Sequence, residues 1–197
     1  MSAELTTTDK PKLPTLQDLN ADSELAYKND VLNKLLNEPP PQKWIKGHPF
    51  VNVKNEQGQN IPLPYLPIDK VEYLLTRIFQ EWKVEVKNVQ QLFNSVAVTI
   101  TLHYKNPLTG EWKSHDGVGA CGIQTDKGAS AADLTAIKQS AVMMALPSAK
   151  SYAIKDAADH LGKLFGRDLS RKDTVGFTPS YMPSDLLNAT AEPVKTE

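Results

Sequence analysis

The chain has 197 residues, of which 40% are hydrophobic, and its formal net charge is -1. This length is sufficient to bury one sizeable hydrophobic core. A single cysteine excludes an internal disulfide and is typical of a reducing compartment. No apolar run approaches the roughly 20 residues that a membrane-spanning helix requires, and the first residues lack the apolar stretch of a signal peptide. We therefore expect a soluble, cytoplasmic protein without a membrane partner.

The charge is distributed unevenly along the chain. Residues 1–39 and residues 173–197 each carry a net charge of -3, whereas residues 40–172 carry +5. A basic body favours a polyanionic partner, although an ordinary solvated surface explains this modest excess equally well. Residues 1–20 have no hydrophobic periodicity and are predicted to form a disordered N-terminal arm. Residues 173–197 are predicted to form a flexible acidic tail, which leaves 40–172 as the folded core domain.

Two amphipathic helices are predicted in the first half of the chain. Residues 21–38 place leucines on one side of a short helix, and the prolines at 39–41 end it. Such a helix is marginal alone and needs to pack on its own domain or on a neighbouring subunit. A proline-rich stretch follows, and its residues 57–60 predict a turn. Residues 68–79 then show clear helical periodicity, and Pro67 suits the first position of that helix.

The hydrophobic period then changes from 3.6 to 2. Residues 82–86 and 96–104 alternate apolar and polar side chains, which indicates strands with one buried face. Residues 106–110, with a proline and a glycine, predict a hairpin loop. A third strand at about 111–119 completes a three-stranded antiparallel meander.

A long alanine-rich helix is predicted from Ser130 to Phe165. Apolar and small residues recur there at three- and four-residue steps, so they form a stripe that can pack closely on the sheet. Pro147 should kink or split this helix, because it removes a backbone hydrogen bond. The fold class is therefore α+β, with a helix, a meander and a proline-kinked long helix packed on the sheet.

The chain shows no strong catalytic motif. It has neither a phosphate-binding GxxxxGK[ST] loop nor a G-x-S-x-G nucleophile turn. His103 and His115, with Asp116, lie on paired predicted strands and leave open a metal-dependent nuclease site. Asp156 and Asp159 are interpreted as a solvated helix face or as inter-subunit contacts. No cofactor is predicted.

Lysines and tyrosines on the predicted sheet and helix form a candidate nucleic-acid surface. Lysine contacts to phosphates give affinity without reading base sequence, and an aromatic ring among them can stack on a base. Taken singly, each lysine also fits an ordinary solvated surface, and Tyr152 also fits the helix core. The candidate residues are Lys83, Lys87, Lys105, Lys113, Lys127, Lys138, Lys150, Lys155, Tyr152 and Tyr65.

The order of these elements, together with several short motifs, resembles a known family. The segment from Tyr65 to Phe165 is similar to the annealing domain of Rad52-like single-strand annealing proteins, a superfamily that includes phage recombinases of the Sak, Red beta and RecT types. The motifs that carry the resemblance are Tyr65-Leu66-Pro67-Ile68, Trp82, Gly117-Val118-Gly119, Ala153-Ile154-Lys155 and Leu161-Gly162.

The resemblance implies a β-β-β-α core that assembles into a homo-oligomeric ring or filament and is not an enzyme. It implies a phage-type recombination and repair protein that anneals complementary single strands of DNA without ATP. On this basis Lys150, Tyr152 and Lys155 line an inner DNA groove, and Lys127 belongs to an outer contact. Where eukaryotic members have a Lys-Arg pair, this chain has Ser151-Tyr152. The acidic tail would bind a single-strand-binding protein or an exonuclease.

Two alternatives to DNA annealing stay open at this point. The first is a structural oligomerisation or interaction domain without annealing activity, in which the long helix and the meander serve assembly alone. The second is the nuclease that uses His103, His115 and Asp116.

Overall fold

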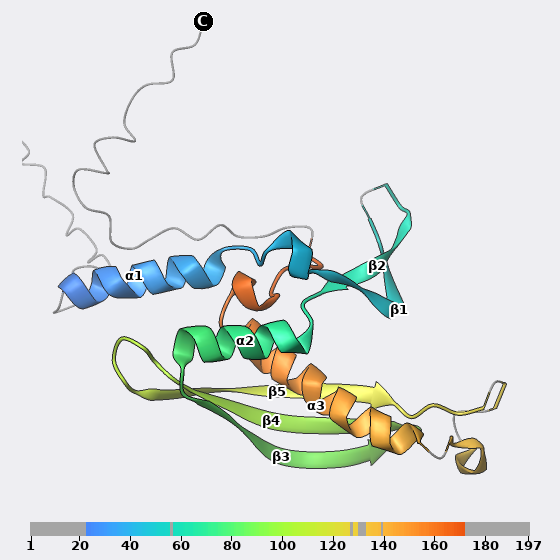
Figure 1. The fold of residues 1–197 in the computed structure, drawn as a ribbon. Coiled ribbons are helices and arrows are strands. Elements are labelled where there is room, and N and C mark those ends of the chain that lie inside the picture. Colours follow the sequence, from blue (N-terminus) through green and yellow to red (C-terminus); the bar gives the residue numbers. More distant parts are fainter. Residues whose placement is uncertain (1–22, 56, 127, 130–132, 139, 172–197) are drawn as a thin grey trace, which may run out of the picture.

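The computed structural model describes residues 23–171, except 56, 127, 130–132 and 139. The predicted N-terminal arm, the predicted acidic tail and Lys127 lie outside the described residues. Short 3-10 turns at Gln42–Trp44, Leu134–Ala136 and Lys163–Phe165 join the main elements (Figure 1). The helices and strands are α1 (Ser23–Asn37), β1 (Lys46–Lys54), β2 (Asn60–Tyr65), α2 (Ile68–Phe79), β3 (Trp82–Leu92), β4 (Ser95–Lys105), β5 (Trp112–Gly122) and α3 (Ala141–Asp159).

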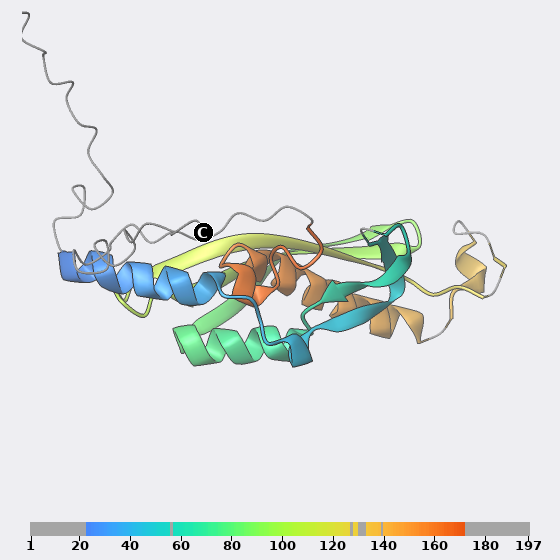
Figure 2. The same cartoon turned by 90° about the horizontal axis from the view of Figure 1, so that it is seen from above.

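The meander predicted from the alternating pattern is confirmed. Strands β3, β4 and β5 form an antiparallel sheet in that order, and β4 is its central strand. Alternate residues of β4 are buried, and two of them, Ile100 and Leu102, have no exposed surface and form the middle of the core. Helices α2 and α3 lie over this face of the sheet, and no helix of the described residues covers the other face (Figures 1 and 2). The α+β class expected from the sequence is therefore the observed one.

Helix α3 approaches β5 unusually closely, because both elements have small residues at their contact. The stripe on α3 consists of alanines, among them Ala149 and Ala153, which are fully buried. Opposite them, β5 has Gly117 and Gly119, where an added Cβ would collide with the carbonyl oxygens of Ala153 and Ala149, respectively. A larger side chain at either glycine would push the helix away from the sheet.

The long helix is shorter than predicted and is not split at Pro147. It begins at Ala141 rather than Ser130 and ends at Asp159 rather than Phe165. Pro147 lies within it, and the residue that loses a hydrogen-bond partner, Met143, is 77% exposed, so water can satisfy its carbonyl. Burial of the alanine stripe against the sheet stabilises the helix on both sides of the proline.

Helix α1 packs on its own domain. The sequence leaves open whether this helix packs there or on a neighbouring subunit. Leu36 is buried among core residues, and its backbone lies so close to Gly162 that a Cβ there would collide with it. The side chain of Arg167 donates a hydrogen bond of 2.8 Å to Asn37 at the end of α1. These contacts connect the turn that follows α3 to the C-terminal end of α1.

Strands β1 and β2 form a separate two-stranded antiparallel hairpin. Its turn contains Gly58, in agreement with the predicted turn at 57–60. Within the described residues, no helix is long and apolar enough to cross a membrane.

Candidate nucleic-acid interface

A groove lies between the β1–β2 hairpin and α3, and we call it the hairpin–helix groove. Its central side chains are His48 from β1, Tyr65 from β2, and Tyr152 and Lys155 from α3. A cavity of about 330 Å³ opens between the hairpin and the stretch of α3 around Pro147. A second cavity of about 340 Å³ continues past Tyr65 toward β5 and the turn after α3.

Lys155 lies between two aromatic rings. Its Nζ atom is 4.7 Å from the ring centroid of Tyr65 and 4.5 Å from that of Tyr152. Both distances are within the range of cation–π attraction. Burial lowers the pKa of Lys155, and the negative charge of Asp159 opposes that change. The groove therefore contains a partly desolvated ammonium group held by two tyrosines.

His48 connects the two tyrosines and was not predicted as a site residue. Its Nε2 atom lies 3.2 Å from the hydroxyl oxygen of Tyr152, and its ring meets that of Tyr65 edge-on, with centroids 5.7 Å apart. Burial is the main cause that raises the pKa of the Tyr152 hydroxyl. The backbone N–H of Val51 donates to Nδ1 of His48, so the neutral imidazole carries its proton on Nε2 and donates to the hydroxyl oxygen of Tyr152. No motif in the sequence marks His48, because its partners come from β2 and from α3 far along the chain.

Two carboxylates, those of Asp156 and Asp159, follow Lys155 on α3. Asp156 accepts a hydrogen bond of 2.9 Å from the backbone N–H of Val118 on β5. Asp159 lines the second cavity, and burial, followed by the charge of Asp156, raises its pKa to about 6. Asp156 thus joins α3 to β5 within this chain, and Asp159 is half-buried rather than part of a solvated face.

An apolar cavity of about 850 Å³ adjoins the groove beyond Tyr152. It lies between β1, the end of β5 and the first turns of α3. Tyr152 borders this cavity as well as the other two, so its ring is the point at which all three meet. The apolar cavity is lined by His48, Val51, Ala120, Cys121, Gly122, Gln124, Ala141, Met144, Ala145, Ser148 and Tyr152.

The structure brings together three of the predicted site residues, namely Tyr65, Tyr152 and Lys155. An elongated groove with an ammonium group and flat rings can bind a phosphate chain and stack on bases.

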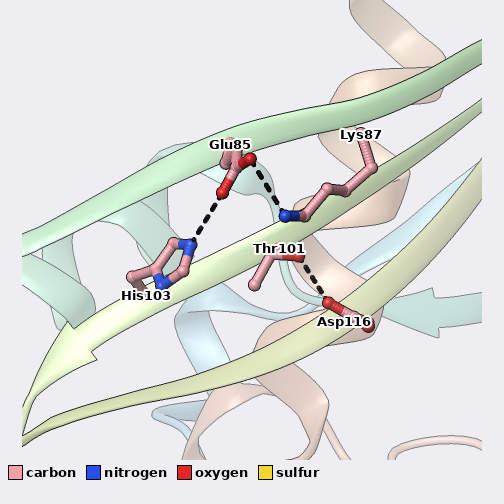
Figure 3. Close-up of polar contacts among 5 residues, drawn as sticks. All are labelled: Glu85, Lys87, Thr101, His103 and Asp116. Atoms are coloured by element: carbon pink, nitrogen blue, oxygen red, sulfur yellow. Dashed lines mark hydrogen bonds and ion pairs between the residues drawn. The ribbon is translucent and has the colours of Figure 1, made fainter.

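Three other candidate lysines lie on the opposite, open face of the sheet, and each has a partner there. Lys87 forms an ion pair of 2.9 Å with Glu85, as Figure 3 shows. Lys105 forms one of 2.7 Å with Glu81. The third, Lys83, has its Nζ atom 5.6 Å from the ring centroid of Trp112. These lysines are therefore separated from the groove by the thickness of the sheet.

The remaining candidates are dispersed. Lys113 lies on the covered face of the sheet, in register with Tyr104, and lines a small cavity with His115 and His160. Lys150 is exposed on α3, and Lys138 is exposed shortly before that helix begins. Neither lines one of the three cavities around Tyr152.

The proposed nuclease constellation does not assemble. His103 lies on the open face, with its Nε2 3.2 Å from Glu85, and Asp116 accepts a hydrogen bond from Thr101 on the same face (Figure 3). His115 points to the other face, where its Nε2 is 3.0 Å from the hydroxyl oxygen of Tyr104. The two histidines are out of phase on paired strands, so their side chains point to opposite faces of the sheet. Among the described residues, no group of three or more His, Cys, Asp or Glu could hold a metal ion.

Comparison with known protein families gives a match. A family model described as "Rad52/22 family double-strand break repair protein" matches residues 45–179. The matched segment includes the β1–β2 hairpin, the meander and α3, and therefore all the residues that line the groove. No curated protein matches the chain.

Proposed function

The chain belongs to the Rad52/22 family of double-strand break repair proteins, and from this premise we propose that it binds single-stranded DNA in the hairpin–helix groove. The protein then anneals complementary strands in recombination and repair, without ATP and as a homo-oligomeric ring or filament. Annealing requires binding that is indifferent to base sequence, and phosphate contacts combined with ring stacking have that property.

The observation that carries this proposal is the position of Lys155 between Tyr65 and Tyr152. The ammonium group neutralises a backbone phosphate, and the two rings offer flat surfaces to neighbouring bases or sugars. His48 keeps the ring of Tyr152 in one orientation through the hydroxyl contact. A strand lying in the groove would thus find its contacts already arranged.

The other lysines have secondary roles in this proposal. Lys138 and Lys150 are exposed near or on α3, outside the cavities around Tyr152, and are proposed to add positive charge that attracts the strand. On the open face, Lys83, Lys87 and Lys105 already have partners, so they contribute less to DNA affinity. Lys127 is proposed to belong to an outer DNA contact, and Lys113 remains a proposed DNA-binding residue. The acidic C-terminal residues are proposed to bind a single-strand-binding protein or an exonuclease.

An annealing assay tests this function. Complementary oligonucleotides are mixed without ATP, with and without protein, and duplex formation is followed by fluorescence quenching. Replacing Lys150 and Lys155 together by Ala should abolish most of the acceleration and weaken single-strand binding, while the size of the assembly stays unchanged. The matched control replaces Lys83 and Lys87 by Ala, which removes the same charge from the open face. Absence of annealing by the wild-type protein at low salt would reject the function, and equal losses in both double variants would reject the groove.

A second candidate function is assembly alone, without annealing activity. The first turns of α3 expose apolar side chains, including Met143 (77% exposed) and Met144 (70% exposed), which suit a contact between copies. A large assembly by electron microscopy, combined with no strand annealing, would favour this alternative.

A further inference from the structure

The groove holds an acid next to Lys155, the one lysine among the described residues that line its two cavities. Asp159 follows Lys155 by one turn of α3, and both line the second cavity together with Tyr65. The rest of that cavity includes apolar groups such as Phe165 and Leu169. A phosphate that approaches Lys155 therefore also approaches the carboxylate of Asp159. These groups are poorly solvated, and charges interact more strongly there than in water.

Charged groups from several segments face this carboxylate. Asp156 on α3 repels its negative charge, whereas Lys155 on α3, His160 just after α3 and Arg167 in the following turn stabilise it. Burial outweighs these attractions, and the net result is a pKa of about 6 for Asp159. Arg167 is also engaged with α1 through Asn37, so it is not free to turn toward an incoming phosphate without losing that bond.

We propose that the hairpin–helix groove takes up a proton on Asp159 when it binds the backbone of single-stranded DNA, so that binding tightens as the solution becomes mildly acidic. This inference rests on the proposed DNA-binding function and adds a means of regulating the same site. With Asp159 ionised, its charge offsets that of Lys155. With Asp159 protonated, the charge of Lys155 acts on the phosphate without that opposition, and the neutral carboxyl can donate a hydrogen bond to a phosphate oxygen.

The size of the effect follows from linkage. Each unit by which DNA binding raises the pKa of Asp159 corresponds to about a tenfold gain in affinity once the pH is below both pKa values. His48 and His160 also lie near this site, where His48 lines the first cavity and the charge of His160 stabilises the ionised Asp159. The test must therefore remove the carboxylate and keep the histidines.

The experiment measures the affinity of the full-length protein for a thymidine oligonucleotide at about pH 7.5 and about pH 5.5, at constant salt. Thymine does not titrate in this range, and the label is a rhodamine whose emission does not depend on pH. Wild-type protein, Asp159→Asn and the control Glu111→Gln are compared by fluorescence anisotropy. Glu111 lies in the β4–β5 loop, outside the three cavities around Tyr152.

With a rise of about one unit in the pKa of Asp159 on binding, the wild-type affinity should increase roughly sixfold between the two pH values. The Asp159→Asn variant should bind at about pH 7.5 as tightly as the wild type binds at about pH 5.5, with little further change. The Glu111→Gln variant should keep the wild-type ratio. If Asp159→Asn keeps that ratio as well, another group carries the pH dependence and the inference is wrong, although the proposed function survives. If the wild type binds no oligonucleotide at either pH, the proposed function fails first.

A second measurement does not depend on the folding of a variant. The carboxyl carbon resonance of Asp159 in the wild-type protein should titrate with a midpoint near 6. Addition of the unlabelled thymidine oligonucleotide should raise this midpoint. A midpoint that stays in place when the DNA is bound would overturn the inference.

Discussion

The Nζ atom of Lys155 on α3 lies 4.7 Å from the ring centroid of Tyr65, the last residue of β2. This contact links the helix to the hairpin and holds the cation at the surface where the two elements meet. Because Tyr152 lies on the other side of the same ammonium group, 4.5 Å away, loss of the lysine affects both rings.

We expect Lys155→Gln to weaken single-strand binding and to make it less dependent on salt. Loss of one phosphate contact should reduce the slope of log affinity against log salt by about 0.7. Lys155→Arg, which keeps the charge and the stacking, should retain most of the affinity. Anisotropy titrations over a series of salt concentrations check both variants. An unchanged slope for Lys155→Gln would exclude a phosphate contact at this residue.

The contact between Tyr152 and His48 predicts a graded effect of two substitutions. Tyr152→Phe keeps the ring but removes the hydroxyl that lies 3.2 Å from His48, so we expect a loss of about twofold to threefold in single-strand affinity. Tyr152→Ala also removes the stacking surface, and the loss should be about tenfold or more. Equal losses for Phe and Ala would mean that the hydroxyl, and not the ring, contacts the DNA.

The close packing of α3 on β5 predicts that Gly119→Ala destabilises the protein. The added methyl group would meet the carbonyl of Ala149 and the Cβ of Tyr152, so we expect a loss of about 1 to 3 kcal/mol in the free energy of unfolding. Gly122→Ala on the same strand is the matched control, because no atom lies within 4 Å of its added Cβ. Urea denaturation of both variants checks the difference. Similar stabilities would contradict the close approach of the helix.

Asp159 should reduce the stability of the folded protein at neutral pH. Its pKa rises from 3.8 to about 6 on folding, so the folded state binds more protons between these values and stability falls as the pH rises through them. After allowance for partial solvent exposure, Asp159→Asn should be more stable than the wild type by about 1 to 2 kcal/mol at neutral pH. This difference in the free energy of unfolding between the two proteins should disappear when the pH falls below 3.8, the pKa of Asp159 in the unfolded chain. Urea titrations of both proteins at a series of pH values measure it, and a constant difference would contradict the prediction.

Local patterns predicted the elements of the domain well. Helix α2 has the predicted bounds of 68–79, because Pro67 and a regular apolar period define it without help from the rest of the chain. The three strands of the meander follow from alternation and from the loop at 106–110, but β3 extends to Leu92, beyond the alternating residues 82–86. The start of α3 was predicted wrongly, because helical spacing of apolar residues continues through a segment that forms a 3-10 turn at Leu134–Ala136.

The groove was predicted only in part. Lys155 and Tyr152 could be found because they lie close together on one helix beside other lysines. His48 and Asp159 could not be found, since their roles depend on how the hairpin and the turn after α3 pack against that helix. For the same reason, the sequence could not separate the lysines of the open face from those near the groove. To distinguish these two groups of lysines, one must know which face of the sheet the helices cover.

The collision that a methyl group at Gly119 would make with the Cβ of Tyr152 has a further consequence. The distance between α3 and the sheet also fixes the position of Tyr152 in the groove. The backbone of α3 at this residue cannot move closer to the sheet without distorting β5. The side chains of the groove therefore lose much of their conformational entropy when the protein folds, and lose less when a ligand binds. A ligand then gains affinity from surfaces that are already immobile, and a substitution in β5 that loosened the helix would weaken binding without touching the ligand.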